Sequence, residues 1–172
     1  MQHTPGQASN ILKSELTPLP NPFPPGAGLL FLREEEMRIA QDELILAFRD
    51  LHAAPDAMLR ELGFGRAHHR TLHWINRMPN LKMGELLAIL GVTKQSLARV
   101  LRPLTRQGYV EQDIGKIDRR QRVLIVTEKG KALERKLFEC QRERLAAAYR
   151  EAGGHAIEGF GRVLRGLASE QG

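Results

Sequence analysis

Two short segments of this sequence hold cationic and amide side chains whose types suit hydrogen bonding to nucleic acid. In the first, Lys94, Gln95, Arg99 and Arg102 share one face of a helix if the segment is helical. Ser96 lies near the tip of that helix, and Thr93 is its N-cap. Glutamine can form two hydrogen bonds with adenine, and arginine or lysine can bond guanine. A helix N-terminus also carries a partial positive charge that favours anions. An ordinary solvated helix face has the same composition, so this segment alone leaves both interpretations open.

The second segment places four cations around one carboxylate. The cations are Lys116, Arg119, Arg120 and Arg122, and the carboxylate is Asp118. Like charges crowded on a free surface loop repel one another, whereas a nearby phosphate backbone or narrow minor groove relieves that repulsion. Asp118 is expected to orient an arginine rather than to contact DNA. Residues 82–126 hold nine Lys or Arg against four Asp or Glu, so they carry most of the formal net charge of +6.

The elements that position the first segment follow from apolar spacing and from turn residues. A short helix is expected from Met83 to Leu90, closed by Gly91, and a second runs from an N-cap at Thr93 to about Gln107. The inward stripe of the second helix is Leu97, Val100, Leu101 and Leu104. Two short helices joined by three residues predict a helix-turn-helix.

The second segment lies between two stretches with β-like patterning. These are Tyr109–Ile114 and Arg122–Thr127, and the charged residues 115–121 form the loop between them. A hairpin directly after a helix-turn-helix is a wing. The sequence therefore predicts a mainly α chain with a small β-hairpin wing, a winged helix-turn-helix.

The flanking regions divide the rest of the chain. A helix with an unusually wide apolar face is expected over about 29–51, stopped or broken at Pro55, and another over 66–77. Thr127 can cap a long helix to about Ala152, and a last apolar stripe follows Gly153-Gly154. The expected divisions are a Pro-rich flexible leader at 1–26, an N-terminal dimerisation helix and short helix at 27–63, the winged helix-turn-helix at 64–127, and C-terminal dimerisation helices at 128–172.

Two details of the predicted helix-turn-helix depart from a regular pattern. Pro103 lies within the second helix, where it cannot donate to the Arg99 carbonyl, so a kink or an early end is expected there. The first helix has Lys82 and Met83 at its start instead of a capping residue, so its first turn is expected to fray.

Other residues suggest metal or redox chemistry. His69 and His73 are one helical turn apart beside His68, but no third ligand is placed by spacing, and His69 falls on the core face. Cys140 has basic neighbours, yet it shares an apolar stripe with Leu133, so a packing role is favoured over a redox sensor.

Composition excludes several classes of protein. One cysteine excludes an internal disulfide framework and a cysteine-based zinc site. The sequence has no apolar run long enough to span a bilayer and no signal-peptide pattern at its start, so a cytoplasmic protein is expected. No nucleophile–base pair, phosphate-binding glycine loop or dinucleotide fingerprint is present, so neither an enzyme nor a cofactor is expected.

The motifs around the wing resemble those of the MarR family. Asp118-x-Arg120, followed after five residues by Val126-Thr127-x-x-Gly130, is similar to that family's wing signature, which usually has Leu where Val126 stands. Leu86 to Leu97 is similar to its helix-turn-helix, and Tyr109-Val110-Glu111 to its first wing strand. The resemblance covers roughly residues 29–168 and leaves out the Pro-rich leader.

The resemblance implies an obligate homodimer in which the first helix and the last two helices of each subunit interlock. It also implies that Arg120 enters the minor groove, held by Asp118, while the helix after Thr93 reads the major groove of an inverted-repeat operator. Members of the family usually repress promoters, and many release DNA when a small aromatic ligand, an oxidant or a metal binds. The ligand pocket of the family corresponds to the region near His52, Met58 and Trp74.

Two alternatives remain open. A winged helix can be a protein-interaction module whose basic wing binds an acidic partner, which predicts no preference among DNA sequences. A small metal-dependent enzyme built on the histidines predicts stoichiometric metal in the purified protein.

Overall fold

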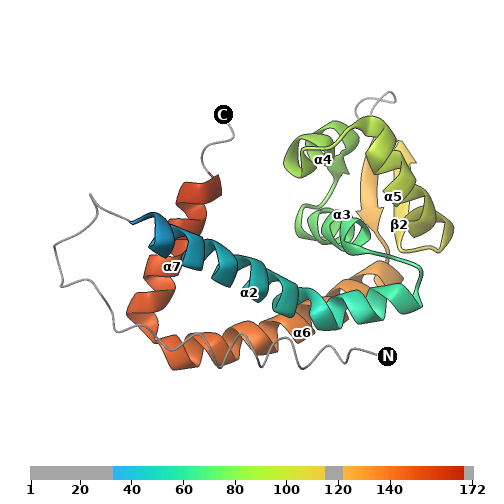
Figure 1. The fold of residues 1–172 in the computed structure, drawn as a ribbon. Helices are drawn as coiled ribbons and strands as arrows, with labels where there is room; N and C mark the ends of the chain where they lie inside the picture. The colour runs from blue at the N-terminus through green and yellow to red at the C-terminus, as the bar shows by residue number, and fades with distance from the viewer. Residues whose placement is uncertain (1–32, 115–121, 169–172) are drawn as a thin grey trace, which may run out of the picture. The chain divides into compact units, whose positions relative to one another are not determined.

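The computed structural model describes residues 33–114 and 122–168, and it is mainly helical (Figure 1). Its contacts divide the chain into two units, residues 1–45 and 46–172, and helix α2 passes from the first into the second. The elements are α2 (Glu34–Glu61), α3 (Arg66–Arg77), β1 (Leu81–Lys82), α4 (Met83–Leu90), α5 (Lys94–Arg106), β2 (Val110–Ile114), β3 (Arg122–Val126), α6 (Glu128–Ala152) and α7 (Gly154–Ala168). The predicted mainly α fold with a small hairpin is confirmed.

Helix α2 starts with favourable charges and continues through a proline. Glu34, Glu35 and Glu36 occupy its first turn, where carboxylates interact favourably with the positive end of the helix dipole. The prediction that Pro55 stops or breaks the helix was wrong, because α2 extends to Glu61. A proline inside a helix costs about 3 kcal/mol. Pro55 and Leu59 are both buried, and this packing offsets that cost.

Helix α3 is the centre of the second unit. It packs against α4, α5, β3 and α6 (Figure 1). The Gly65 backbone N–H donates to Nδ1 of His68 at 3.0 Å, so a side chain from within the first turn takes the place of a conventional cap. The core around α3 is almost entirely aliphatic, and Phe64 and Tyr109 are its aromatic members: Leu59, Phe64, Leu72, Ile75, Leu81, Leu86, Leu97, Leu101, Leu104, Tyr109, Val110, Leu124, Leu133 and Leu137.

The hairpin belongs to a three-stranded antiparallel sheet with the order β1-β3-β2. Leu124 of β3 pairs with Gln112 on one side and with Leu81 on the other. The sequence did not predict β1. It also predicted a frayed first turn for α4, which was wrong, because the Lys82 N–H donates to Oε2 of Glu85 at 2.9 Å and strand pairing holds the residues before the helix.

Glycine and threonine fix the ends of the next helices. Gly91 and Gly108 have φ angles of 61° and 73°, the left-handed conformation that ends α4 and follows α5. Thr127 caps α6 as predicted: its Oγ1 accepts from the Gly130 N–H at 3.0 Å and donates to the Gly108 carbonyl at 2.7 Å. A Cβ atom on Gly130 would overlap the Tyr109 carbonyl oxygen and lie 2.7 Å from Cγ2 of Val126. The Thr-x-x-Gly pattern is therefore a requirement of close packing.

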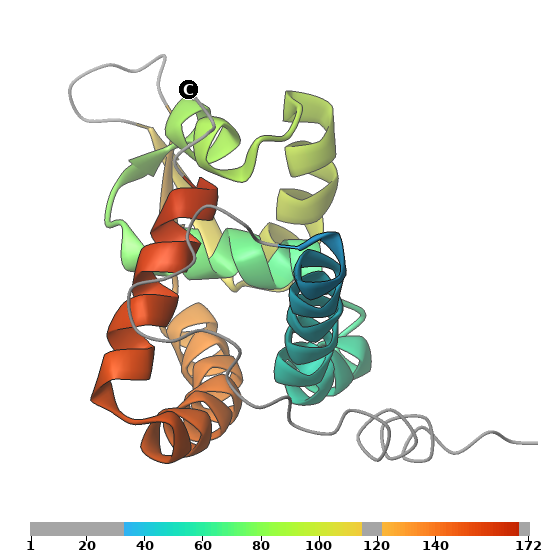
Figure 2. The same cartoon turned by 60° about the vertical axis from the view of Figure 1, so that its left-hand side comes forward.

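Helix α7 follows α6 after Gly153 and packs against it (Figure 2). In a single chain α7 has no buried residue. Its exposed apolar side chains follow helical spacing, and Leu167 is 64% exposed: Phe160, Val163, Leu164 and Leu167. Over residues 33–114 and 122–168, no helix is both long and apolar enough to cross a bilayer.

Candidate nucleic-acid interface

Helix α5 separates apolar from polar side chains as its spacing predicts. Leu97, Leu101 and Leu104 are each at most 2% exposed and pack into the core, and Val100 is half-buried against it. The opposite face is open to solvent and holds the predicted contact residues Thr93, Lys94, Gln95, Ser96, Arg99 and Arg102. The predicted major-groove residues therefore share one exposed surface.

The start of α5 is fixed by two hydroxyl groups. Thr93 is the N-cap, and its Oγ1 accepts from the Ser96 N–H at 3.2 Å. The Thr93 hydroxyl also donates to Oγ of Ser96 at 3.0 Å. Ser96 keeps its own hydroxyl proton for an acceptor outside the helix, such as a phosphate or a base edge.

Among the described residues, α2, α3 and α6 each hold at least one arginine that pairs with a carboxylate, whereas α5 holds none. Ion pairs on those three helices involve Arg38, Arg49, Arg66, Arg142 and Arg144. Arg99, Arg102 and Arg106 of α5 are exposed, and none of the three pairs with a carboxylate in the part of the chain that the structure describes. Bare guanidinium groups on one helix face attract a polyanion.

Pro103 does not end α5. The helix runs to Arg106, and the Gln107 N–H still bonds the Pro103 carbonyl at 3.0 Å, so the expectation of an early end was wrong. A kink at Pro103 stays a prediction. The last turn of α5 lies within the predicted range to about Gln107, and it places Arg106 on the exposed face, a residue that the sequence reasoning did not single out. The signal was present in the sequence, since the spacing from Arg99 to Arg102 to Arg106 continues the same stripe.

Most of the predicted wing residues lie outside the described residues. These are Lys116, Asp118, Arg119 and Arg120. Arg122 is the first residue of β3 and pairs with Ile114, but its side chain also falls outside what the structure describes. The described strands place the two ends of the loop side by side.

The three neighbouring histidines of α3 lie in different surroundings. His69 is 7% exposed, as its core-face position predicted, and burial first, then the charges of His52 and His73, lower its pKa below the ordinary 6.5. Burial also lowers the pKa of His68, which stacks on Phe64 with ring centroids 4.9 Å apart. Among the residues that the structure describes, no three His, Cys, Asp or Glu side chains are grouped so as to hold a metal ion.

His73 joins α3 to α6. Its Nδ1 lies 3.0 Å from Oε1 of Glu134, and Nδ2 of Asn76 donates to the other carboxylate oxygen, also at 3.0 Å. The Glu134 side chain is only 12% exposed. Spacing along the sequence gave no signal of this link, because its partners lie about 60 residues apart. Cys140 of α6 is half-buried, with its Sγ 3.7 Å from the Met58 sulfur.

Comparison with known proteins agrees with this geometry. A family model described as MarR family matches residues 62–121. The HTH-type transcriptional regulator PetP of Rhodobacter capsulatus is 49% identical over 144 residues, which is 84% of this chain and 87% of that protein.

Solved structures share the fold. FabT of Streptococcus pneumoniae, crystallised in complex with DNA, superposes with a TM-score of 0.67 at 21% identity and covers 77% of this chain and 94% of its own. NadR in complex with 4-hydroxyphenylacetate gives a TM-score of 0.63 at 22% identity, with 74% and 91% covered. Given the fold, the exposed cationic helix and the identity to PetP, the chain belongs to the MarR family of helix-turn-helix transcriptional regulators.

Proposed function

We propose that this chain is a homodimeric regulator that binds an inverted-repeat DNA operator by base sequence and represses transcription there. The observation that carries the proposal is the face of α5, where arginines that pair with none of the described carboxylates are exposed while the leucines opposite them are buried. A DNA duplex supplies phosphates and guanine acceptors for those guanidinium groups.

Each group of contact residues has a distinct role. Gln95 and Arg99, near the start of α5, read base edges in the major groove, and Ser96 bonds a base or phosphate. Arg120 enters the minor groove with Asp118 orienting it, as the family resemblance implies. The other cations of the wing, Lys116, Arg119 and Arg122, face the phosphate backbone.

The homodimer is proposed from apolar side chains that a single chain leaves exposed. Leu164 and Val163 of α7 are 43% and 57% exposed, and Met37 at the start of α2 is 53% exposed. Large apolar surfaces of this kind mark interfaces. Residues 27–63 and 128–172 then serve dimerisation, and residues 64–127 bind DNA.

Selection of bound sequences from a random DNA pool, repeated at two salt concentrations, tests the proposal. We expect an inverted repeat with half-sites about 10 base pairs apart. Gln95→Ala and Arg99→Ala should each relax preference at discrete positions by about 1–3 kcal/mol, whereas Arg142→Ala on α6 should leave it unchanged. Binding without any sequence preference would favour the protein-interaction module instead.

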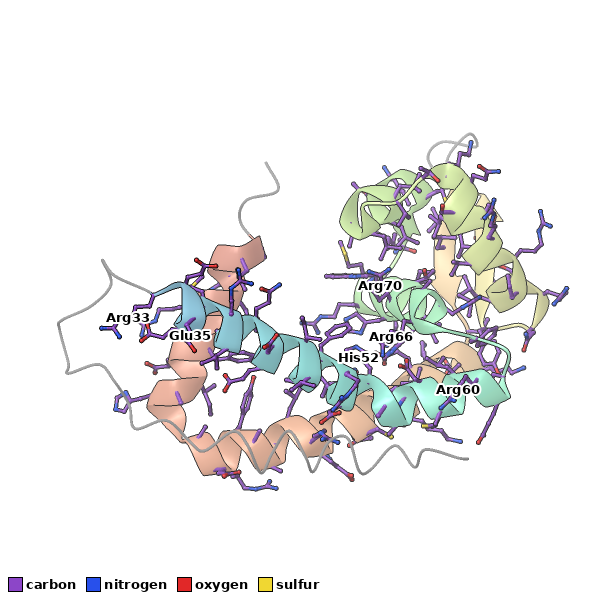
Figure 3. All side chains as sticks on the ribbon, viewed as in Figure 1. Arg33, Glu35, His52, Arg60, Arg66 and Arg70 are labelled. Atoms are coloured by element: carbon purple, nitrogen blue, oxygen red, sulfur yellow. The ribbon has the colours of Figure 1, made fainter. Side chains whose placement is uncertain are left out.

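A small-molecule effector is proposed from a hollow of about 410 Å³ between the last turns of α2 and the start of α3. It is lined by Phe64, by Asp56 and by three arginines, of which Figure 3 labels Arg60 in the last turn of α2 and Arg66 at the start of α3: Arg49, Arg60 and Arg66. Arg66 pairs with Asp56 at 2.7 Å and lies over the Phe48 ring, while Arg60 has no carboxylate partner within the described ranges. Guanidinium groups beside an aromatic ring suit an aromatic carboxylate.

Calorimetric titration with 4-hydroxyphenylacetate and related aromatic carboxylates tests this effector site. Binding that weakens in Arg60→Ala supports it. Equal binding to the wild-type chain and to Arg60→Ala places any effector elsewhere.

A further inference from the structure

The cationic stripe of α5 continues past the residues expected to read bases. Gln95, Arg99, Arg102 and Arg106 are separated by four, three and four residues, so they share one face over the length of the helix. All four are exposed. The stripe ends in the last turn of the helix, at Arg106.

Two hollows lie along this stripe. The first, of about 480 Å³, is lined by Lys94 and Arg106 at the two ends of α5 and by Gln112 of β2, so it follows the helix beside the first wing strand. The second, of about 380 Å³, is lined by Gln95, Arg99 and Pro103. Arg102 and Arg106 line both hollows, and none of the described carboxylates lines either one. Within the described residues, the charge along the two hollows is therefore positive.

The length of the stripe separates its two ends on a DNA duplex. From Gln95 to Arg106 the helix rises by roughly 16 Å, at 1.5 Å per residue. The major groove is about 12 Å wide. If Gln95 reaches base edges and the axis of α5 crosses the groove, Arg106 lies beyond the groove edge, where the phosphates are.

We infer that Arg106 binds a backbone phosphate of the operator, at the site between α5 and β2, and that this contact carries affinity without base preference. The inference rests on the proposed function. It divides the stripe into a base-reading end at Gln95 and Arg99 and a phosphate-binding end at Arg106. Arg102 lies between the two.

Salt titration of DNA binding with the full chain tests the inference. Each phosphate contact contributes about 0.9 to the slope of log affinity against log salt. Arg106→Ala should lower the slope by about that amount for selected and scrambled DNA alike, and should leave the selected sequence unchanged. Arg106→Lys should keep the slope, since the charge is retained, and Arg135→Ala, which removes an exposed arginine of α6, is the matched control.

The results separate this inference from the proposed function. A wild-type slope in Arg106→Ala, or a shift of base preference at discrete positions, overturns the phosphate role while leaving the regulator intact. A wild-type chain that shows no preference for any sequence overturns the proposed function, and the inference falls with it.

Discussion

Helices α5 and α7 are both amphipathic, but α5 exposes its polar face and α7 exposes its apolar face. In α5 the leucines are buried under α3 and the sheet, and the arginines are bare. In α7 no residue is buried, and the apolar stripe from Phe160 to Leu167 is open. A helix face that the described residues of the chain do not cover is available to a partner. The bare charge of α5 suits a polyanion, and the bare apolar stripe of α7 suits an apolar surface such as its own copy.

The largest expected effect comes from placing a charge on the bare stripe of α7. Leu164→Asp should raise the dissociation constant of the homodimer by at least about a hundredfold, because each buried leucine contributes about 1.5–3 kcal/mol and two copies are affected. Sedimentation equilibrium measures the change. Arg162→Asp puts the same carboxylate on an exposed polar position of α7 and is the control.

A dimer that survives Leu164→Asp at micromolar concentration would break the comparison, because the stripe would then serve another purpose. A dimer lost equally in both variants would show that charge on α7, and not the apolar stripe, controls association.

The next effect concerns Gly130, a buried glycine in the first turn of α6. Gly130→Ala should lower the free energy of unfolding by about 1–3 kcal/mol, because its methyl group meets the Tyr109 carbonyl and Val126. Urea denaturation measures the loss. Gly84→Ala in α4, where a Cβ atom meets nothing within 4 Å, should instead stabilise the fold slightly. A stability of Gly130→Ala equal to that of the wild type would mean that this junction is looser than the contacts indicate.

Residues close in sequence predicted the ends of the helices well, but the sequence predicted the packing between distant residues poorly. Gly91, Gly108 and Thr127 mark ends of α4, α5 and α6 correctly, because caps and left-handed turns depend on residues close in sequence. Pro55 misled, because its burial beside Leu59 offsets the local cost of a proline. Strand β1 has only two residues, too few for a periodic pattern, and it exists because β3 is already in place.

In the candidate site, too, local spacing predicted some features and could not predict others. Helical spacing predicted which α5 residues are exposed, since the leucine stripe fixes the opposite face. It did not single out Arg106, although the helix was predicted to run to about Gln107, because Pro103 also indicated a kink or an early end before that residue. The Glu134 link between α3 and α6 was out of reach of any local pattern.

The smallest expected effect is the dependence of stability on pH. His69 is a buried residue of α3, and burial lowers its pKa below the ordinary 6.5. Below about pH 6.5 the unfolded chain binds a proton at this site that the folded chain resists, so stability falls as the pH falls through that value, by at most about 1.4 kcal/mol per pH unit. Well above pH 6.5 neither state is protonated, and the contribution is constant.

Urea denaturation of His69→Gln between pH 5.5 and 7.5 isolates this slope. The variant should lose less stability on acidification than the wild type, whatever its stability at pH 7.5, because the readout is the difference between two pH values. His155→Gln on α7 is the control and should keep the wild-type slope, since folding leaves this side chain exposed to water. Identical slopes in His69→Gln and the wild type would mean that water reaches His69 in the core around α3. The difference in burial between α3 and the exposed helix α7 would then be smaller than the structure indicates.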